Sequence, residues 1–142
     1  MIILDTDIIS LLDRQTGEVF ENLVRRFAAV PDDERVCATI VSFEEHMRGW
    51  LGQIAAARKT EAQVLAYGRL QRLLLEYQSR DILPYDDSAA VTFARLQRNR
   101  TRIGTMDMRI GAIALTYDEL LISRNLRDFK RIPNLRVEDW TN

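Results

Sequence analysis

The chain has 142 residues, of which 46% are hydrophobic and 29% are charged. This composition predicts one globular domain over residues 1–142, because a second domain would have too little sequence for its own core. A formal net charge of −1 excludes a strongly cationic coat for nucleic acid. All basic residues except Lys59 and Lys130 are arginines, which is compatible with phosphate binding and equally with surface salt bridges.

Cysteine content and hydropathy indicate the cellular compartment of the protein. Cys37 is the only cysteine, so the chain has neither an internal disulfide nor a thiolate metal cluster. The stretch before the first acid, Met1 to Leu4, is too short for the apolar region of a signal peptide, and no later run reaches the length of a membrane span. We therefore expect a cytoplasmic protein with no membrane attachment.

Short β-branched runs alternate with longer helical patterns along the chain. Strands are predicted at 2–4, 35–39, 81–83 and 119–123, with a last one near the end in LRVEDW. Helical spacing of apolar residues predicts helices over 18–29 and 60–78. This alternation predicts βαβ units, and so an α/β fold in which right-handed crossovers put helices on both faces of a mainly parallel sheet.

The predicted helix over 60–78 carries a broad apolar stripe. Its members are Val64, Leu65, Leu70, Leu73, Leu74 and Tyr77. We expect most of the stripe to pack in the core, with the remainder available to a second protein chain, and we expect a homodimer.

Four acidic residues stand where strands end or helices begin: Asp5, Glu45, Asp107 and Asp128. Because ligand sites form at the carboxyl ends of parallel strands, these side chains could meet in one pocket. Carboxylates at contact distance repel one another unless a divalent cation neutralises them. The sequence therefore predicts a metal site.

Two of these acids also have structural explanations. Asp5 or Asp7 could cap the helix that begins beside them, although only one of the pair is needed for that. Ser42 and Glu45 have the spacing of a capping box, with Ser42 at the N-cap. A glutamate in that first turn still points toward the sheet edge that carries Asp5, so capping and metal binding remain compatible.

The two C-terminal acids have similar alternatives. Asp107 in a first helical turn is favoured by the helix dipole whatever the function, with Thr105 as a plausible N-cap. Gly111 within the same helix suggests close packing against another backbone. Asn125 and Asp128 lie in a loop after a predicted strand, where such residues usually form turns.

Other chemistries lack the necessary residues. His46 is the only histidine, so a Ser-His-Asp triad, a Cys-His pair and a two-histidine nuclease mechanism are disfavoured, and we expect His46 on a helix surface. No glycine-rich phosphate loop is present. Arg102, Arg124 and Arg127 flank the acidic segments and could hold a phosphate backbone, against the alternative of a solvated surface.

Four segments, in order, carry a family resemblance: LDTDIIS after the first strand, VSFEEHMRG, IGTMDMRIGAIAL, and LLISRNLRDFKRIPNLRVEDW at the end. Together they resemble the PIN-domain family, specifically the VapC-like ribonuclease toxins of bacterial toxin–antitoxin pairs. The resemblance covers nearly the whole chain. It implies a three-layer α/β/α fold and metal-dependent hydrolysis of RNA phosphodiester bonds.

The resemblance also assigns roles to residues. It implies Mg²⁺ or Mn²⁺ bound by Asp5, Glu45, Asp107 and Asp128, with Asn125 as a further catalytic residue. Asn125 stands where many relatives carry an aspartate. His46 replaces a small aliphatic residue after the glutamate, which keeps Glu44 open as a substitute for Glu45. Ser123 or Asn125 could hydrogen-bond to water or to a ligand. The implied partners are an RNA substrate and a cognate antitoxin.

Two alternatives remain at this point. IILDTD echoes the nucleophile motif of haloacid-dehalogenase-like phosphatases, with Asp5 attacking and Asp7 as the acid, but neither Lys59 nor Lys130 is suitably placed. The second alternative is a PIN-like module that binds RNA or protein with little or no catalysis. Grouped acids argue against it, since unneutralised grouping costs stability.

Overall fold

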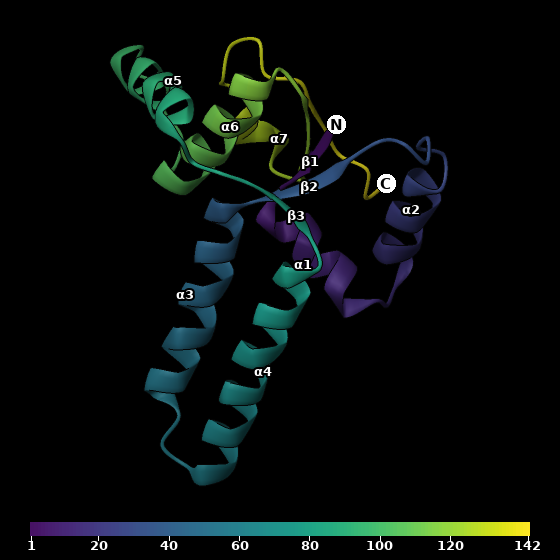
Figure 1. The fold of residues 1–142 in the computed structure, drawn as a ribbon, viewed down its shortest axis with the longest axis vertical. Helices are drawn as coiled ribbons and strands as arrows, with labels where there is room; N and C mark the ends of the chain where they lie inside the picture. Colours follow the sequence, from purple (N-terminus) through teal and green to yellow (C-terminus); the bar gives the residue numbers. More distant parts are fainter.

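The computed structural model describes residues 1–142 (Figure 1). The elements are, in order, β1 (Ile2–Leu4), α1 (Thr6–Arg14), α2 (Glu18–Phe27), β2 (Val36–Thr39), α3 (Ile40–Ala56), α4 (Thr60–Gln78), β3 (Asp81–Leu83), α5 (Asp87–Arg98), α6 (Thr105–Tyr117), β4 (Leu120–Ile122), α7 (Leu126–Phe129) and β5 (Val137–Glu138). None of the helices combines the length and apolar content needed to cross a bilayer.

The sheet has the order β3-β2-β1-β4-β5, and all four pairings are parallel. This confirms the predicted α/β architecture. The bounds of β1 and β3 are those predicted, whereas β2, β4 and β5 are shorter than expected and α2 ends two residues early. Such short strands form a stable sheet because each central strand is paired on both sides and buried on both faces.

Alternation along the strands creates two hydrophobic cores. Ile3, Cys37 and Leu121 face a core shared with α5, α6 and α7. Their neighbours Ile2 and Ile122 face the opposite core, which includes buried residues of α1, α2 and α4. Figure 1 shows these two helical groups on either side of the sheet, which confirms the three-layer arrangement.

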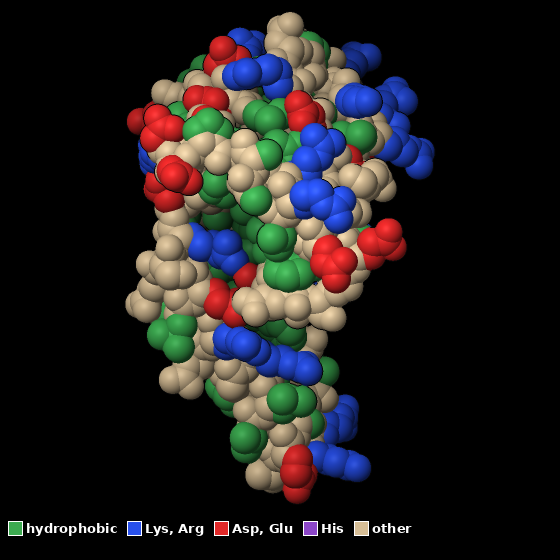
Figure 2. Space-filling model, turned by 90° about the vertical axis from the view of Figure 1, so that its right-hand side faces the viewer, with side chains coloured by type: hydrophobic (Ala, Val, Ile, Leu, Met, Phe, Trp, Pro, Cys, Tyr) green, Lys and Arg blue, Asp and Glu red, His purple; other side chains and the backbone are tan.

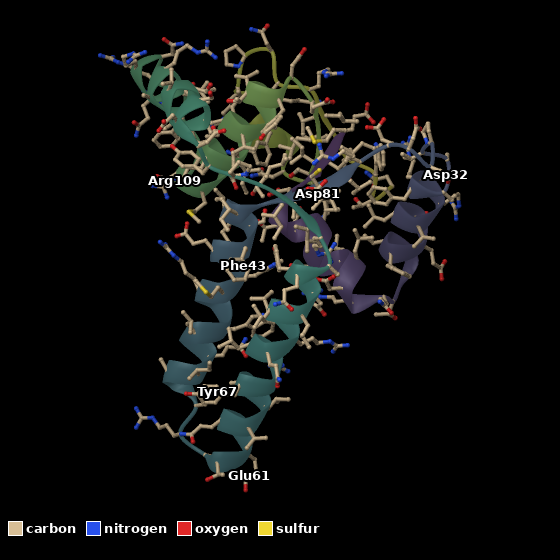
Figure 3. All side chains as sticks on the ribbon, viewed as in Figure 1. Asp32, Phe43, Glu61, Tyr67, Asp81 and Arg109 are labelled. Atoms are coloured by element: carbon tan, nitrogen blue, oxygen red, sulfur yellow. The ribbon has the colours of Figure 1, made fainter.

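The α3–α4 hairpin projects well beyond the sheet, with Glu61 at its tip (Figures 1 and 3). Only the end of α4 nearest the sheet reaches the core, where Leu73 and Tyr77 are buried. Val64 and Leu65 are 69% and 55% exposed. The expectation that most of the α4 stripe packs in the core is therefore wrong, because the outer turns of α4 have only α3 beside them and their other faces meet solvent. Figure 2 shows the hairpin as a narrower extension whose hydrophobic side chains are intermixed with charged ones.

Two predicted helix caps are also wrong. Thr39, not Ser42, is the N-cap of α3, and its Oγ1 accepts a hydrogen bond from the Ser42 N–H at 3.1 Å. The helix starts earlier than the capping-box spacing suggested because β2 leads directly into it. Likewise, α6 has Gly104 at its N-cap, and Thr105 is its first helical residue.

Gly111 is packed tightly, but against a side chain. A Cβ atom at this position would lie 2.3 Å from Cδ1 of Ile132, a buried residue beyond α7. The expected contact with another backbone is therefore wrong. The missing side chain instead lets the segment that follows α7 lie directly on α6, which holds Asn125 close to Asp107. Asp128 was predicted in a loop but lies in the short helix α7, whose N-cap is Asn125.

Candidate functional site

The candidate site lies where the winding of the sheet reverses. From β1 the chain builds β2 and β3 on one side and then β4 and β5 on the other, so the carboxyl ends of β1 and β4 adjoin. Asp5 directly follows β1 and Ser123 directly follows β4, and the Ser123 hydroxyl donates to Asp5 Oδ2 at 2.6 Å. Such a switch point is where open parallel sheets bind their ligands.

A polar hollow of about 370 Å³ opens at this point and has no hydrophobic lining residue. Its lining consists of Asp5, Thr6, Asp7, Ser10, Glu45, Asp107 and Asn125. We call it the acidic pocket. Three of the four predicted acids and the predicted asparagine are therefore brought together, from β1, α3, α6 and the loop after β4.

Asp128 lies just behind this lining. The amide nitrogen of Asn125 donates one hydrogen bond to Asp107 Oδ2 at 2.9 Å and another to Asp128 Oδ2 at 3.1 Å. Both amide hydrogens thus bridge the two carboxylates and offset their repulsion. An aspartate at position 125 would have no hydrogen to offer, and it would add a third negative charge.

Glu45 and Glu44 point to different surfaces. Glu45 Oε1 accepts a hydrogen bond from the Thr6 hydroxyl at 2.8 Å, which fixes the carboxylate at the acidic pocket. Glu44 instead pairs with Arg48 at 2.5 Å and faces a separate hollow that is mostly hydrophobic. The geometry therefore favours Glu45 as the site residue.

His46 is half-buried, so the expectation of a surface position is wrong. Its Nε2 lies 2.7 Å from Ser10 Oγ, and its Nδ1 lies 2.8 Å from the hydroxyl of the buried Tyr77. The Ser10 hydroxyl already donates to the Thr6 carbonyl at 3.0 Å, so it must accept from Nε2–H. Burial lowers the pKa of His46, which favours the neutral ring, and a neutral ring with its proton on Nε2 can accept from the Tyr77 hydroxyl at Nδ1.

Burial opposes ionisation throughout the acidic pocket. It raises the pKa of Asp5 from 3.8 to about 7, partly offset by the hydrogen bond from Ser123 and reinforced by the charge of Asp7. Burial also raises the pKa values of Glu45 and Asp107. The three groups cannot all be charged near neutral pH without cost, and a bound cation would remove that cost.

The donor chemistry of the acidic pocket fits a hard divalent ion. Every side-chain donor in it is an oxygen or an amide, which suits Mg²⁺ or Mn²⁺ better than zinc. Asp7 Oδ1 is buried and has no hydrogen-bond partner, which leaves one carboxylate oxygen for a cation to bind. No three acidic, histidine or cysteine side chains converge on a common point. Hydrogen bonds from Thr6, Ser123 and Asn125 hold the acids in their present places.

Sequence reasoning missed three members of the pocket. Thr6 holds Glu45, and Ser10 connects α1 to His46. Asp7 Oδ2 accepts from Arg124 Nε at 2.8 Å, so Asp7 is a lining acid with an arginine partner. The only signal for Asp7 was that one acid of the DTD pair was left without a capping role. Asp5 takes that role, because its Oδ1 accepts from the Thr6 N–H at 2.8 Å.

The three arginines predicted to bind RNA differ in their surroundings. Arg124 is held at the acidic pocket by Asp7. Arg127 and Arg102 are exposed, and the Arg102 carbonyl accepts a hydrogen bond from Arg131 at 2.6 Å. Only Arg124 thus contacts a pocket residue, and RNA binding by all three stays a prediction.

Comparison with known proteins identifies the family and agrees with the fold. Residues 2–135 match the PIN domain. The chain belongs to the PIN domain family. Over 110 residues it is 30% identical to the tRNA(fMet)-specific endonuclease VapC of Salmonella typhimurium, covering 75% of this chain and 76% of that protein. It is 26% identical to ribonuclease VapC1 of Haemophilus influenzae strain R2866 over 139 residues, covering 97% and 96% of the two chains.

Solved structures agree with this membership. The VapBC-1 structure from nontypeable Haemophilus influenzae matches with a TM-score of 0.76 and 22% identity over 100% of both chains, which shows the shared fold. The DNA-bound VapBC structure from Salmonella typhimurium matches with a TM-score of 0.69 and 25% identity, covering 98% and 97%. Membership in the PIN family replaces the haloacid-dehalogenase alternative.

Proposed function

We propose that this PIN-domain protein is a metal-dependent endoribonuclease, the toxin of a toxin–antitoxin pair, with the acidic pocket as its active site. The observation that carries the proposal is that Asp5, Glu45 and Asp107 line one polar pocket at the sheet's switch point, in a chain whose relatives are VapC ribonucleases. Asp128 supports the set through Asn125. We propose that it acts in the cytoplasm, and the tRNA specificity of one relative makes transfer RNA the first substrate to try.

The proposed metal ligands are Asp5, Glu45, Asp107 and Asp128, together with Asp7 through its unpartnered oxygen. A bound Mg²⁺ or Mn²⁺ supplies positive charge and a more acidic water for attack on phosphorus. The chain's own residues position these groups. Thr6 orients Glu45 and Ser123 orients Asp5. Asn125 bridges Asp107 and Asp128. Arg124 places a guanidinium beside Asp7 at the acidic pocket, where it would bind a phosphate of the RNA.

The neighbouring glutamates give a matched test of this assignment. We expect Glu45→Gln to reduce Mn²⁺-dependent cleavage of total RNA by about a hundredfold or more, because loss of a ligand exceeds the usual effect of groups that orient ligands. Glu44→Gln should retain parental activity, since that side chain faces away from the acidic pocket. Cleavage is followed by gel electrophoresis, with EDTA as the metal-free control. Equal loss in both variants would contradict the role of Glu45.

Ser123 offers a test of ligand orientation. Ser123→Ala removes the hydroxyl that donates to Asp5 and that accepts the Asn125 N–H at 2.9 Å. The Asp5 pKa should rise further, because that hydrogen bond opposes the effect of burial. We expect a roughly 10–100-fold loss of cleavage at pH 7, with partial recovery at pH 9. A pH–rate profile parallel to the parent's would contradict this role.

The alternative of a module that only binds RNA or protein predicts that metal ions have no effect, whereas the ribonuclease proposal predicts that cleavage requires them. If the acidic pocket binds no cation, Mn²⁺ leaves the melting temperature unchanged, and cleavage is absent in every metal. Metal-dependent cleavage that is lost in Asp5→Ala and in Asp107→Ala rejects this alternative.

The exposed apolar residues of the hairpin support the antitoxin part of the proposal. Phe43, Met47, Tyr67 and Leu74 line a hydrophobic hollow between α3 and α4. Figure 3 labels Phe43 on α3 and Tyr67 on α4. Antitoxin binding is tested by co-expressing this chain with a candidate antitoxin from a neighbouring reading frame and measuring co-purification and loss of cleavage. The homodimer stays a prediction, and light scattering of the purified chain tests it.

A further inference from the structure

A second hollow adjoins the acidic pocket where α1 meets the sheet-proximal part of the α3–α4 hairpin. Its volume is about 430 Å³, and only two of its ten lining residues are hydrophobic. We call it the hairpin-base pocket. Ser10 lines both hollows, and its partner His46 lines the hairpin-base pocket. The two hollows are therefore neighbours that share the Ser10 side chain as a wall.

The charges of the hairpin-base pocket favour a phosphate. Its two carboxylates are neutralised: Asp13 pairs with Arg80, and Glu76 pairs with Arg72 at 3.2 Å. Two further lining arginines, Arg14 and Arg69, contact no carboxylate. Since arginine forks bind phosphate oxygens bidentately, these two side chains are available to an anionic ligand.

An aromatic ring lies beside one of these arginines. The Arg69 guanidinium carbon is 5.4 Å from the centroid of the Trp50 ring, and Arg69 Nη1 also donates to Gln53 Oε1 at 3.0 Å. Trp50 packs on the core beside the hairpin and is only partly buried. Unpaired bases stack on aromatic rings and on guanidinium planes, so a base can stack on the Trp50 ring once Arg69, which lies over it, moves to a phosphate.

We propose that the hairpin-base pocket binds an unpaired nucleotide next to the scissile phosphate, with Trp50 stacking on the base and Arg14 and Arg69 binding a phosphate. This rests on the proposed ribonuclease function. The volume suits a small polar ligand. Stacking requires a base that is free of a duplex, so the site would select single-stranded or looped RNA.

The polar lining argues against a protein segment as the occupant. An antitoxin helix would bury an apolar face, and the hydrophobic hollow between Phe43, Tyr67 and Leu74 offers such a surface elsewhere on the hairpin. Only Trp50 and Leu73 are apolar among the residues of the hairpin-base pocket.

Steady-state cleavage of a single-stranded RNA oligonucleotide in Mn²⁺ tests the proposal. We expect Trp50→Ala to raise KM by roughly five- to a hundredfold, the range of base stacking on aromatic side chains, and Trp50→Phe to restore most of the affinity. Arg69→Ala should raise KM and weaken its dependence on salt. Arg48→Ala is the matched control, because Arg48 lies on the same hairpin outside this pocket. In all four variants kcat should stay within about twofold.

Direct binding separates this site from the catalytic proposal. In EDTA, the same oligonucleotide should quench the tryptophan fluorescence of the parent and of Arg48→Ala but not of Trp50→Phe, which retains Trp140. The corresponding duplex should quench weakly. If no metal supports cleavage but this quenching persists, the nucleotide site stands and the ribonuclease proposal fails.

The opposite results overturn the nucleotide site. Cleavage with unchanged KM in Trp50→Ala and in Arg69→Ala, together with no quenching by RNA, rejects it. Variants that leave RNA binding intact but lose inhibition by the antitoxin would show instead that the hairpin-base pocket is a protein-docking surface.

Discussion

Asp5→Asn is expected to stabilise the metal-free protein at pH 8 while abolishing cleavage of RNA. Asp5 is only 5% exposed, and burial raises its pKa to about 7, so its charged form is costly in the folded state. The amide keeps the shape of the side chain and removes the charge. We expect a gain of about 1–3 kcal/mol in the free energy of unfolding. Cleavage in Mn²⁺ should fall by about a hundredfold or more.

Urea denaturation in EDTA at pH 5 and pH 8 measures the stability change. At pH 5 the gain should largely disappear, because the parental carboxyl is then protonated in the folded state. Asp33→Asn is the matched control, since Asp33 is exposed and lies far from the acidic pocket in the sequence. A variant that is less stable than the parent at both pH values, or that still cleaves RNA within tenfold of the parent's rate, would contradict the account of Asp5.

The sheet and the convergence of acids could be predicted from local patterns. A run such as Ile2–Leu4 between polar residues indicates a buried strand, and an acid that directly follows it must lie at the carboxyl edge of the sheet. Strand ends therefore place Asp5 and the loop of Asn125 without any knowledge of packing. Assignment of roles depends on the resemblance to the PIN family, because helix capping is the simpler explanation of Glu45 and an alternative explanation of Asp5.

Contacts between helices could not be predicted in the same way. The bond from Thr6 to Glu45 depends on how α1 approaches α3, and periodicity contains no information on that geometry. His46 was placed at the surface because a lone polar residue in a helix usually lies there, yet Ser10 and Tyr77 enclose it. An apolar stripe shows which face of α4 avoids water. It does not show whether this chain or another one covers that face.

Stability and metal binding should show opposite responses to pH. The folded state holds a proton on Asp5 up to about pH 7, whereas the unfolded chain releases it near the ordinary pKa of 3.8. The stabilising contribution is therefore complete below pH 4 and is lost as the pH rises through 7. This shift corresponds to at most about 4 kcal/mol, and the raised pKa values of Glu45 and Asp107 act in the same direction.

In EDTA the melting temperature should therefore fall between pH 5 and pH 8. Mn²⁺ should reverse the fall, because it binds the deprotonated acids and competes with protons for them. A concentration a hundredfold above Kd adds about 2.7 kcal/mol, which raises the melting temperature by roughly 5–10 °C for a chain of this size. The rise in melting temperature caused by Mn²⁺ should be larger at pH 8 than at pH 6.

Differential scanning fluorimetry across this pH range, with EDTA or Mn²⁺, provides the measurement, and Asp5→Asn is the control. Without metal, the melting temperature of the variant should depend less on pH, because its side chain at position 5 does not titrate. Mn²⁺ should raise the melting temperature of the variant by less than that of the parent, because the variant has lost a ligand. A melting temperature in EDTA that rises steadily from pH 5 to pH 8 would mean that Asp5, Glu45 and Asp107 ionise without cost. The electrostatic reason for a cation in the acidic pocket would then be lost, and the convergence of the acids would need another explanation.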